Sequence, residues 1–122
     1  MNQNAVNWFE IPAADMPRAV KFYETVFAVS LKREIIGDEL AIFPSDEMGV
    51  SGCVMGGANS KPSAEGTVVY LNAEPSIDTV LGRVTKAGGK IVVPKTALPP
   101  GMGFFAHIMD SEGNRVGVHA MN

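Results

Sequence analysis

Residues 104–119 read FFAHIMDSEGNRVGVH, which is two strand-like runs separated by the turn-forming residues DSEGN. Successive side chains of a strand point to opposite faces, so every second residue shares a face. One face of the first run suits a core covered by a helix, and it carries Phe104, Ala106 and Ile108. The opposite face, which points away from that core, carries Phe105, His107 and Met109.

A strand, a helix and a further strand precede these two runs. TVVYL at 67–71 is typical of a strand, and Ser76 is a plausible N-cap for the helix that follows. This helix should close at Gly88 and Gly89. Its apolar residues, at helical spacing, are Ile77, Val80, Leu81 and Val84. KIVV then predicts a strand that ends at the breakers VPKTALPPGMG.

The first half of the chain repeats this order. VNWFEI at 6–11 predicts a strand, and Asp15 to Phe27 predicts a helix with Pro17 in its first turn. The apolar stripe of this helix superimposes on that of the second helix after a shift of 61 residues. Three strand-like runs follow, LKREII, ELAIF and VSGCVM.

The chain is therefore an imperfect repeat of strand–helix–strand–strand–strand. We predict a single domain over residues 1–122, with modules at about 4–57 and 65–121 and a linker at 58–64. Each module has about 50 residues, too few to be stable alone, so the two should pack together or exchange with a second chain. A ferredoxin-like double split motif supplies only two strands per helix, and the three strands here argue against it.

Composition narrows the classes of function. The chain has a formal charge of −3 and no cluster of Lys and Arg, which disfavours a nucleic-acid partner. No apolar run is long enough for a signal peptide or a membrane span, so we expect a cytoplasmic protein. The single cysteine, Cys53, fits a reducing compartment and a packing role.

Four stretches together resemble the vicinal oxygen chelate superfamily, which contains glyoxalase I, extradiol dioxygenases, and fosfomycin- and bleomycin-resistance proteins. They are IPAADMPRAVKFYETVF, GTVVYLN, VTKAGGKIVVPKT and FFAHIMDSEGNRVGVH. DSEGN resembles the family's aspartate-proline-x-glycine turn, with Ser111 in place of the proline. The resemblance covers essentially the whole chain. It implies an α+β fold in which two βαβββ modules form a half-open barrel with the helices outside.

The resemblance also implies where a metal would bind. Metal-dependent members place His, Glu or Gln ligands on the first and last strands of both modules. The matching positions of this chain are Trp8, Gly52, Thr67 and Gly117, and none of them is a normal ligand. We therefore expect no metal and no cofactor. The two glycines either leave space for a ligand or for the Trp8 indole, or they allow close packing of the strands or a bulge.

Alternation along the strands predicts which residues line the barrel. Trp8 shares a face with Glu10, whereas Phe9 and Ile11 should belong to the core. The predicted cleft combines aromatic walls with ionisable groups, as small-molecule sites do. Its residues are Trp8, Glu10, Thr67, Phe105, His107 and His119.

Three functions fit these observations. The first is a metal-independent protein that binds a small aromatic or amphipathic molecule, as the bleomycin-resistance branch does. The second is a lyase, isomerase or hydrolase that uses Glu10 with His107 or His119, with or without a divalent metal. The third is an interaction module that has kept only the fold. In each case the resemblance favours a homodimer.

Overall fold

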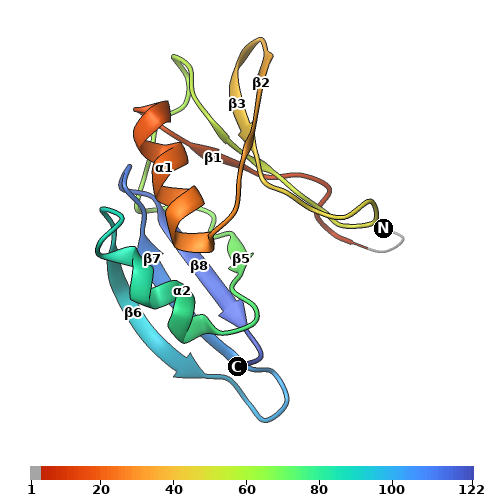
Figure 1. Ribbon diagram of the computed structural model, residues 1–122, viewed down its shortest axis with the longest axis vertical. Helices are drawn as coiled ribbons and strands as arrows, with labels where there is room; N and C mark the ends of the chain where they lie inside the picture. The colour runs from red at the N-terminus through yellow and green to blue at the C-terminus, as the bar shows by residue number, and fades with distance from the viewer. Residues whose placement is uncertain (1–3) are drawn as a thin grey trace.

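Two four-stranded sheets, each with one helix, make up the computed structural model, which describes residues 4–122 (Figure 1). The first unit contains β1 (Glu10–Pro12), α1 (Met16–Phe27), β2 (Lys32–Ile36), β3 (Asp38–Ile42) and β4 (Cys53–Met55). The second contains β5 (Tyr70–Asn72), α2 (Ile77–Val84), β6 (Lys90–Ala97), β7 (Phe104–Met109) and β8 (Arg115–Ala120). The predicted order of strand, helix and three strands, repeated once, is confirmed.

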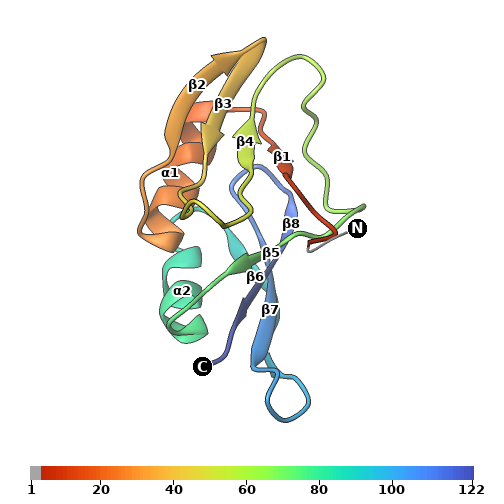
Figure 2. The ribbon, with the colours of Figure 1, turned by 90° about the vertical axis from the view of Figure 1, so that its right-hand side faces the viewer.

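Both sheets have the same topology. The strand order is β1-β4-β3-β2 in the first sheet and β5-β8-β7-β6 in the second. In each sheet the strand before the helix pairs in parallel with the last strand, and the other pairs are antiparallel. The sheets do not close on each other, so the predicted half-open arrangement is confirmed, and Figure 2 shows both helices on the same side of the molecule.

Helix α1 begins and ends as its local sequence dictates. The Asp15 side chain accepts a hydrogen bond from the Arg18 backbone N–H at 3.1 Å, and Pro17 occupies the first turn, where no N–H is needed. The helix ends at Phe27, and its C-cap, Ala28, adopts a left-handed conformation with φ of 53°. Its buried face is Met16, Ala19, Val20, Phe22, Tyr23 and Val26.

Helix α2 is capped by Ser76, as predicted, through a hydrogen bond of 3.4 Å from the Thr79 N–H. The helix itself ends at Val84, four residues before the predicted stop. The backbone N–H groups of Ala87 and Gly88 donate to the carbonyls of Val84 and Thr85, so the chain continues beyond the helix as a hydrogen-bonded turn. Gly88, with φ of 102°, then reverses the chain, which explains why the glycine pair is placed there.

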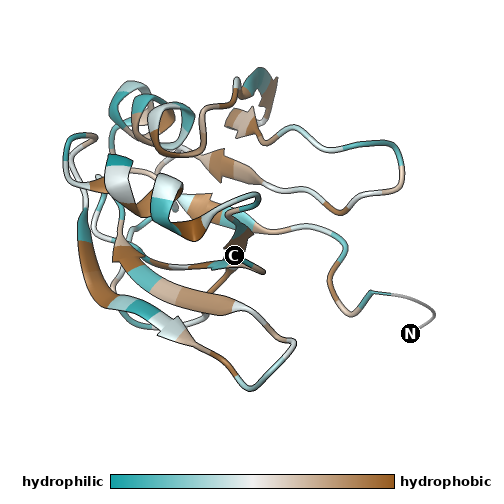
Figure 3. Cartoon of the chain, turned by 60° about the horizontal axis from the view of Figure 1, so that its bottom comes forward, coloured by the Kyte–Doolittle hydropathy of each residue, from teal (hydrophilic) through white to brown (hydrophobic). Residues whose placement is uncertain are grey.

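A continuous hydrophobic core joins the two units. Ala106 and Ile108 of β7 are fully buried, and Phe104 packs against the same core, so the predicted inner face of this strand is confirmed. Ile11 is buried and Phe9 packs against the core, also as predicted. Figure 3 shows apolar and polar residues on both helices, as expected where one face meets the sheets.

Some strand boundaries differ from prediction. β1 begins at Glu10 and β5 at Tyr70, so Trp8 and Thr67 precede their strands. β6 runs through Pro94 to Ala97, with two register shifts against β7. Pro94 is tolerated because β6 is the edge of its sheet, where a missing N–H leaves no partner unpaired. No helix within residues 4–122 is both long enough and apolar enough to cross a membrane.

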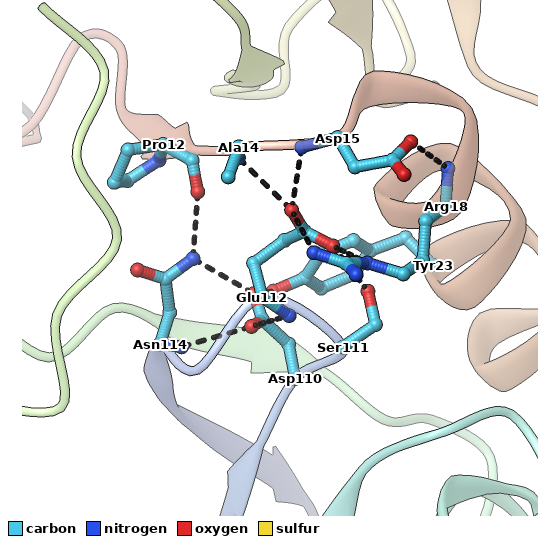
Figure 4. A network of polar contacts seen from close by, with 9 residues as sticks. All are labelled: Pro12, Ala14, Asp15, Arg18, Tyr23, Asp110, Ser111, Glu112 and Asn114. Carbon is cyan, nitrogen blue, oxygen red and sulfur yellow. Dashed lines mark hydrogen bonds and ion pairs between the residues drawn. The ribbon is translucent and has the colours of Figure 1, made fainter.

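A polar network ties the β7–β8 turn of the second unit to the start of the first unit (Figure 4). The Tyr23 hydroxyl donates to Asp110 at 2.5 Å in a buried setting. Asn114 donates to the Pro12 carbonyl at 2.7 Å, and its own side-chain oxygen accepts from the Ser63 N–H at 3.0 Å. The turn therefore fixes β1 and the linker against β8.

Glu112, in the same turn, closes the other side of this network. Its carboxylate accepts from the backbone N–H groups of Ala14 and Asp15 at 2.9 and 2.8 Å, and pairs with Arg18 at 2.6 Å. Burial would raise the pKa of Glu112, but the hydrogen bonds from Arg18, Asp15 and Ser111 outweigh it and lower the pKa overall. The DSEGN turn thus docks on the N-terminus of α1.

Candidate functional site

A hollow with aromatic and apolar walls lies on the face of the second sheet opposite α2, which we call the open face. A cavity of about 720 Å³ occurs there, between β5, β7, β8 and the loop before β7. Its lining, which defines the Tyr70 cavity, is Tyr70, Leu71, Asn72, Glu74, Leu98, Met102, Phe105 and His119. The size is that of pockets for small organic molecules.

Three rings meet on the open face. The ring centroids of Tyr70 and His107 are 5.4 Å apart, those of Phe105 and His107 are 5.8 Å apart, and those of Tyr70 and Phe105 are 6.4 Å apart. All three pairs are edge-to-face, the arrangement that the charge distribution of aromatic rings favours. The rings form one surface because strands β5, β8 and β7 are neighbours in the sheet.

Gly117 makes room for Tyr70. The two residues are direct partners in the β5–β8 pair, and a Cβ at Gly117 would run into the Tyr70 ring. A Cβ at Gly52 would likewise run into the ring of Phe9. Both glycines therefore leave room for an aromatic ring of a neighbouring segment of the chain.

His107 lies between a phenol and a guanidinium. Its Nε2 is 2.6 Å from the Tyr70 hydroxyl, and its Nδ1 is 3.1 Å from Nη1 of Arg115. A guanidinium only donates, so Nδ1 accepts, and the proton of the neutral imidazole lies on Nε2 and is donated to Tyr70. Burial and, next, the charge of Arg115 lower the pKa of His107, which favours the neutral ring.

His119 holds the loop that borders the Tyr70 cavity. Its Nε2 donates to the Met102 carbonyl at 2.7 Å, since a carbonyl oxygen can only accept. Within the loop, Leu98 N–H donates to the Gly103 carbonyl at 2.9 Å. Gly101 and Gly103 both adopt φ of 85°, a conformation that other residues rarely reach. The loop thus places Met102 at the cavity, and the hydrogen bond from His119 ties this residue to β8.

A second cavity, of about 490 Å³, lies between β1, β8 and the linker. Trp8, Glu10 and Thr67 all line it, together with Lys61 and Arg115, and we call it the Trp8 cavity. The six residues of the predicted cleft are therefore divided. Three line the Trp8 cavity, Phe105 and His119 line the Tyr70 cavity, and His107 is joined by hydrogen bonds to one residue of each.

Cys53 lies buried beside this second cavity. Burial and the Glu10 carboxylate raise the pKa of its thiol to about 11, and a hydrogen bond with Trp8 acts in the opposite direction. A thiol with this pKa carries almost no thiolate at neutral pH, so it is a poor nucleophile. The position agrees with the packing role expected from the sequence.

The residues of this chain do not fit a divalent metal at the place the fold suggests. Trp8, Gly52, Thr67 and Gly117 supply no imidazole or carboxylate. Over residues 4–122, no group of three His, Cys, Asp or Glu side chains is close enough together to hold an ion. Glu10 and His119 also line different cavities. We therefore derive no chemistry through a metal.

Two residues of the site were missed by sequence reasoning, Tyr70 and Arg115. Alternation counted from Thr67 puts Tyr70 on the helix side, but the strand begins only at Tyr70, and buried Leu71 sets its faces. Arg115 shares its face with Gly117 and His119, so the alternation already used for His119 also identifies it.

Comparison with known proteins supports one family. Residues 5–118 match the model of the Glyoxalase/Bleomycin resistance protein/Dioxygenase superfamily. No curated protein matches the chain. Among solved structures, a glyoxalase-related enzyme from Fulvimarina pelagi is 18% identical with a TM-score of 0.69, over 97% of this chain and 88% of that one.

Two further structures have the same fold. A glyoxalase/bleomycin resistance protein from Streptomyces sp. CB03234 is 18% identical with a TM-score of 0.69, over 92% of this chain and 96% of that one. A mutant of the fosfomycin resistance protein FosX from Listeria monocytogenes, solved with Mn(II) and a dihydroxypropylphosphonic acid, is 15% identical. Its TM-score is 0.68, over 98% of this chain and 94% of that one. Identities this low establish the fold alone.

Proposed function

The chain belongs to the glyoxalase/bleomycin resistance protein/dioxygenase superfamily, and on that basis we propose that it binds a small aromatic or amphipathic molecule without a metal. The binding site we propose is the Tyr70 cavity. The observation that carries the proposal is its lining, which joins two aromatic rings and apolar side chains to a few polar groups. This combination is the usual composition of a small-molecule site.

The shape of the cavity supports a flat or apolar ligand. Tyr70 and Phe105 offer ring surfaces at 6.4 Å from each other, edge to face, and Tyr70 is 52% exposed. Met102, on the opposite loop, is 55% exposed and has a flexible thioether side chain that adapts to the shape of a ligand. A ligand ring between Met102 and the two aromatic rings would bury apolar surface on both of its faces.

Metal independence is part of the proposal and separates this chain from the Mn(II)-bound FosX structure. It is supported by the non-ligand residues at Trp8, Gly52, Thr67 and Gly117. The competing proposal of a lyase, isomerase or hydrolase based on Glu10, His107 and His119 has less support, because Glu10 lines the other cavity. An interaction module is disfavoured by the size and ring lining of the Tyr70 cavity.

We also propose a homodimer, as the resemblance to the superfamily implies. Supporting it, the β2–β3 hairpin carries two large apolar side chains in solvent, Ile35 at 80% exposure and Ile36 at 69%. A second chain that covered this hairpin would bury them. Sedimentation velocity at micromolar concentration tests the proposal, and a single monomeric species would contradict it.

A pair of aromatic truncations tests which cavity binds. Titration calorimetry with naphthoate should show binding to the unaltered protein. Phe105→Ala should weaken it about tenfold or more, because one wall of the Tyr70 cavity is removed. Trp8→Ala is the matched control, since Trp8 is 43% exposed and does not line the Tyr70 cavity. A larger loss of affinity in Trp8→Ala than in Phe105→Ala would contradict the proposal. Failure of the unaltered protein to bind either naphthoate or neutral naphthalene derivatives would also contradict it.

A further inference from the structure

Charged side chains of both signs line the Trp8 cavity. Its cations are Lys61 and Arg115, and its anions are Glu10 and Glu65. The ion pairs found within residues 4–122 include none of these four, so the opposite charges of this cavity do not pair with each other. Side-chain charges that line one cavity without pairing are available to a molecule that binds there.

A buried asparagine holds the walls of this cavity together. Asn114 lines the cavity and is only 5% exposed. Its amide donates to the Pro12 carbonyl of β1 at 2.7 Å (Figure 4), and its side-chain oxygen accepts from the Ser63 N–H of the linker at 3.0 Å. The next residue, Arg115, begins β8. The three segments around the cavity are therefore fixed before a ligand binds, which lowers the entropic cost of binding.

The charges of Arg115 and Glu10 belong to different sheets. Arg115 is half-buried on β8, and its Nη1 donates to His107 at 3.1 Å, which uses one of the five N–H donors of a guanidinium. Glu10 begins β1 and is the direct partner of Cys53 in the first sheet. Burial and, next, the Glu10 charge raise the pKa of the Cys53 thiol. The cavity is therefore positive where it borders β8 and negative where it borders β1.

The Trp8 indole adds an aromatic surface to these two charges. It is 43% exposed and lines the cavity together with apolar side chains of β1 and β8, Ile11 and Val116. A ligand ring packed against the indole would bury apolar surface. The volume of about 490 Å³ lies in the range of sites for small molecules. A ligand that matches all of these features carries a ring, an anionic group and a cationic group.

We propose that the Trp8 cavity is a second binding site, and that its ligand is a free amino acid with an aromatic side chain. The carboxylate of the ligand would accept from Arg115, its ammonium would donate to Glu10, and its ring would pack against Trp8. A simple anion would be repelled by Glu10 and a simple cation by Arg115, whereas a zwitterion pairs with both. This site does not depend on the binding function proposed for the Tyr70 cavity.

Three probes that share one ring test the two charges. Phenylalanine carries both charges, N-acetylphenylalanine carries only the carboxylate, and phenylalanine amide carries only the ammonium. At about pH 6, below the ordinary α-amino pKa of about 7.7–8.0, the ammonium stays charged. Trp8 is the only tryptophan of the chain, so a change in its fluorescence reports binding in this cavity, and calorimetry gives the affinity independently. Phenylalanine should bind about tenfold more tightly than either derivative, because each derivative loses a hydrogen bond between charged groups.

Substitution of one charge at a time should remove one preference at a time. Glu10→Gln should abolish the preference for phenylalanine over N-acetylphenylalanine and keep the preference over the amide. Arg115→Met should do the converse. The matched controls are Asp78→Asn and Lys95→Met, which change the net charge equally at residues that pair with each other at 3.0 Å on α2 and β6. These controls should leave both preferences unchanged, and thermal unfolding checks that each variant is folded.

Phe105→Ala separates this site from the Tyr70 cavity. Phe105 lines the Tyr70 cavity and not the Trp8 cavity, so the affinity for phenylalanine should stay unchanged in this variant. A loss of phenylalanine binding in Phe105→Ala would place the ligand in the Tyr70 cavity and overturn the inference. Equal affinities of the three probes for the unaltered protein, or no binding of phenylalanine at millimolar concentration, would also overturn it and would leave the proposed function standing.

Discussion

Replacing Tyr23 by phenylalanine tests the buried hydrogen bond that joins the two units. Tyr23 is fully buried on α1, and its hydroxyl donates at 2.5 Å to Asp110, which is 3% exposed in the β7–β8 turn. Burial, next the Asp110 charge, and the hydrogen bond itself raise the pKa of Tyr23 well above its ordinary value. The substitution removes only the hydroxyl and leaves the ring contacts with Phe22 and Phe43 in place.

The expected cost follows from what Asp110 retains. Its carboxylate keeps three hydrogen bonds, from the backbone N–H groups of Glu112 and Asn114 and from the Asn114 amide. Tyr23→Phe thus removes one of four donors to a buried charged group. A hydrogen bond to a charged group contributes about 1.5–3 kcal/mol. We therefore expect the free energy of unfolding to fall by about 2 kcal/mol, a large share of the 5–15 kcal/mol typical of a domain.

Urea unfolding followed by circular dichroism measures this loss, provided the slope with urea is the same for both proteins. Tyr70→Phe is the matched control. It also removes a phenol hydroxyl, but from a residue that is 52% exposed, where water can replace the hydrogen-bond partner. We therefore expect the free energy of unfolding to change by no more than about 0.5 kcal/mol. Equal losses for the two variants, or a loss below about 0.5 kcal/mol for Tyr23→Phe, would refute the reasoning.

Three further predictions concern the Glu112 contacts, the glycines at 82 and 117, and the metal content. The pKa of Glu112 is below its ordinary value of 4.5 in the folded chain, so its stabilisation is present above that pH and is lost as the pH falls further. The free energy of unfolding of Glu112→Gln should therefore approach that of the unaltered protein at acidic pH. A difference between the two free energies that stays constant with pH would contradict this. Gly117→Ala should lower stability by about 1–3 kcal/mol through the clash with Tyr70. Gly82→Ala, at a position on α2 with open space around it, should raise stability by about 0.5–1 kcal/mol. A thermal unfolding experiment in which Gly117→Ala is the more stable of the two variants would argue against the packing role of Gly117. Elemental analysis of protein purified without affinity metal should find no stoichiometric Ni, Zn, Mn or Fe after dialysis, and about one equivalent per chain would defeat metal independence.

The elements of the fold could be predicted from the sequence because their determinants are local. Asp15 and Ser76 cap their helices through hydrogen bonds to residues three positions ahead. The buried faces of both helices follow from apolar residues at helical spacing. The repeat then supplied the topology, since each half had one helix and four strand-like runs.

The contacts between the units could not be predicted in the same way. Tyr23 and Asp110 are 87 residues apart, and Arg18 and Glu112 are 94 apart, so nothing in either local sequence identifies the other. The sequence indicates only that Glu112 belongs to a turn. In the structure its carboxylate lies at the N-terminus of α1, because the two units pack there.

Alternation along the strands predicts part of the grouping of the candidate site. Alternation within β7 and β8 put Phe105, His107 and His119 on one face, and the structure agrees that they share the open face. Trp8 and Thr67 lie outside regular strands, where the alternation of side chains does not predict which way a side chain points. The linker joins β1 in lining a separate cavity around them, which a list of strands does not reveal.

The central claim is that the Tyr70 cavity is the binding site. The most direct test is a two-dimensional ¹H–¹⁵N NMR titration of the unaltered protein with naphthoate. Chemical shifts should change for the backbone amides of β5, β7 and β8 that border the cavity, with Tyr70, Phe105 and His119 foremost, and for Met102 on the loop. Changes gathered instead around Trp8, Lys61 and Thr67, or no changes at millimolar naphthoate, would contradict the claim.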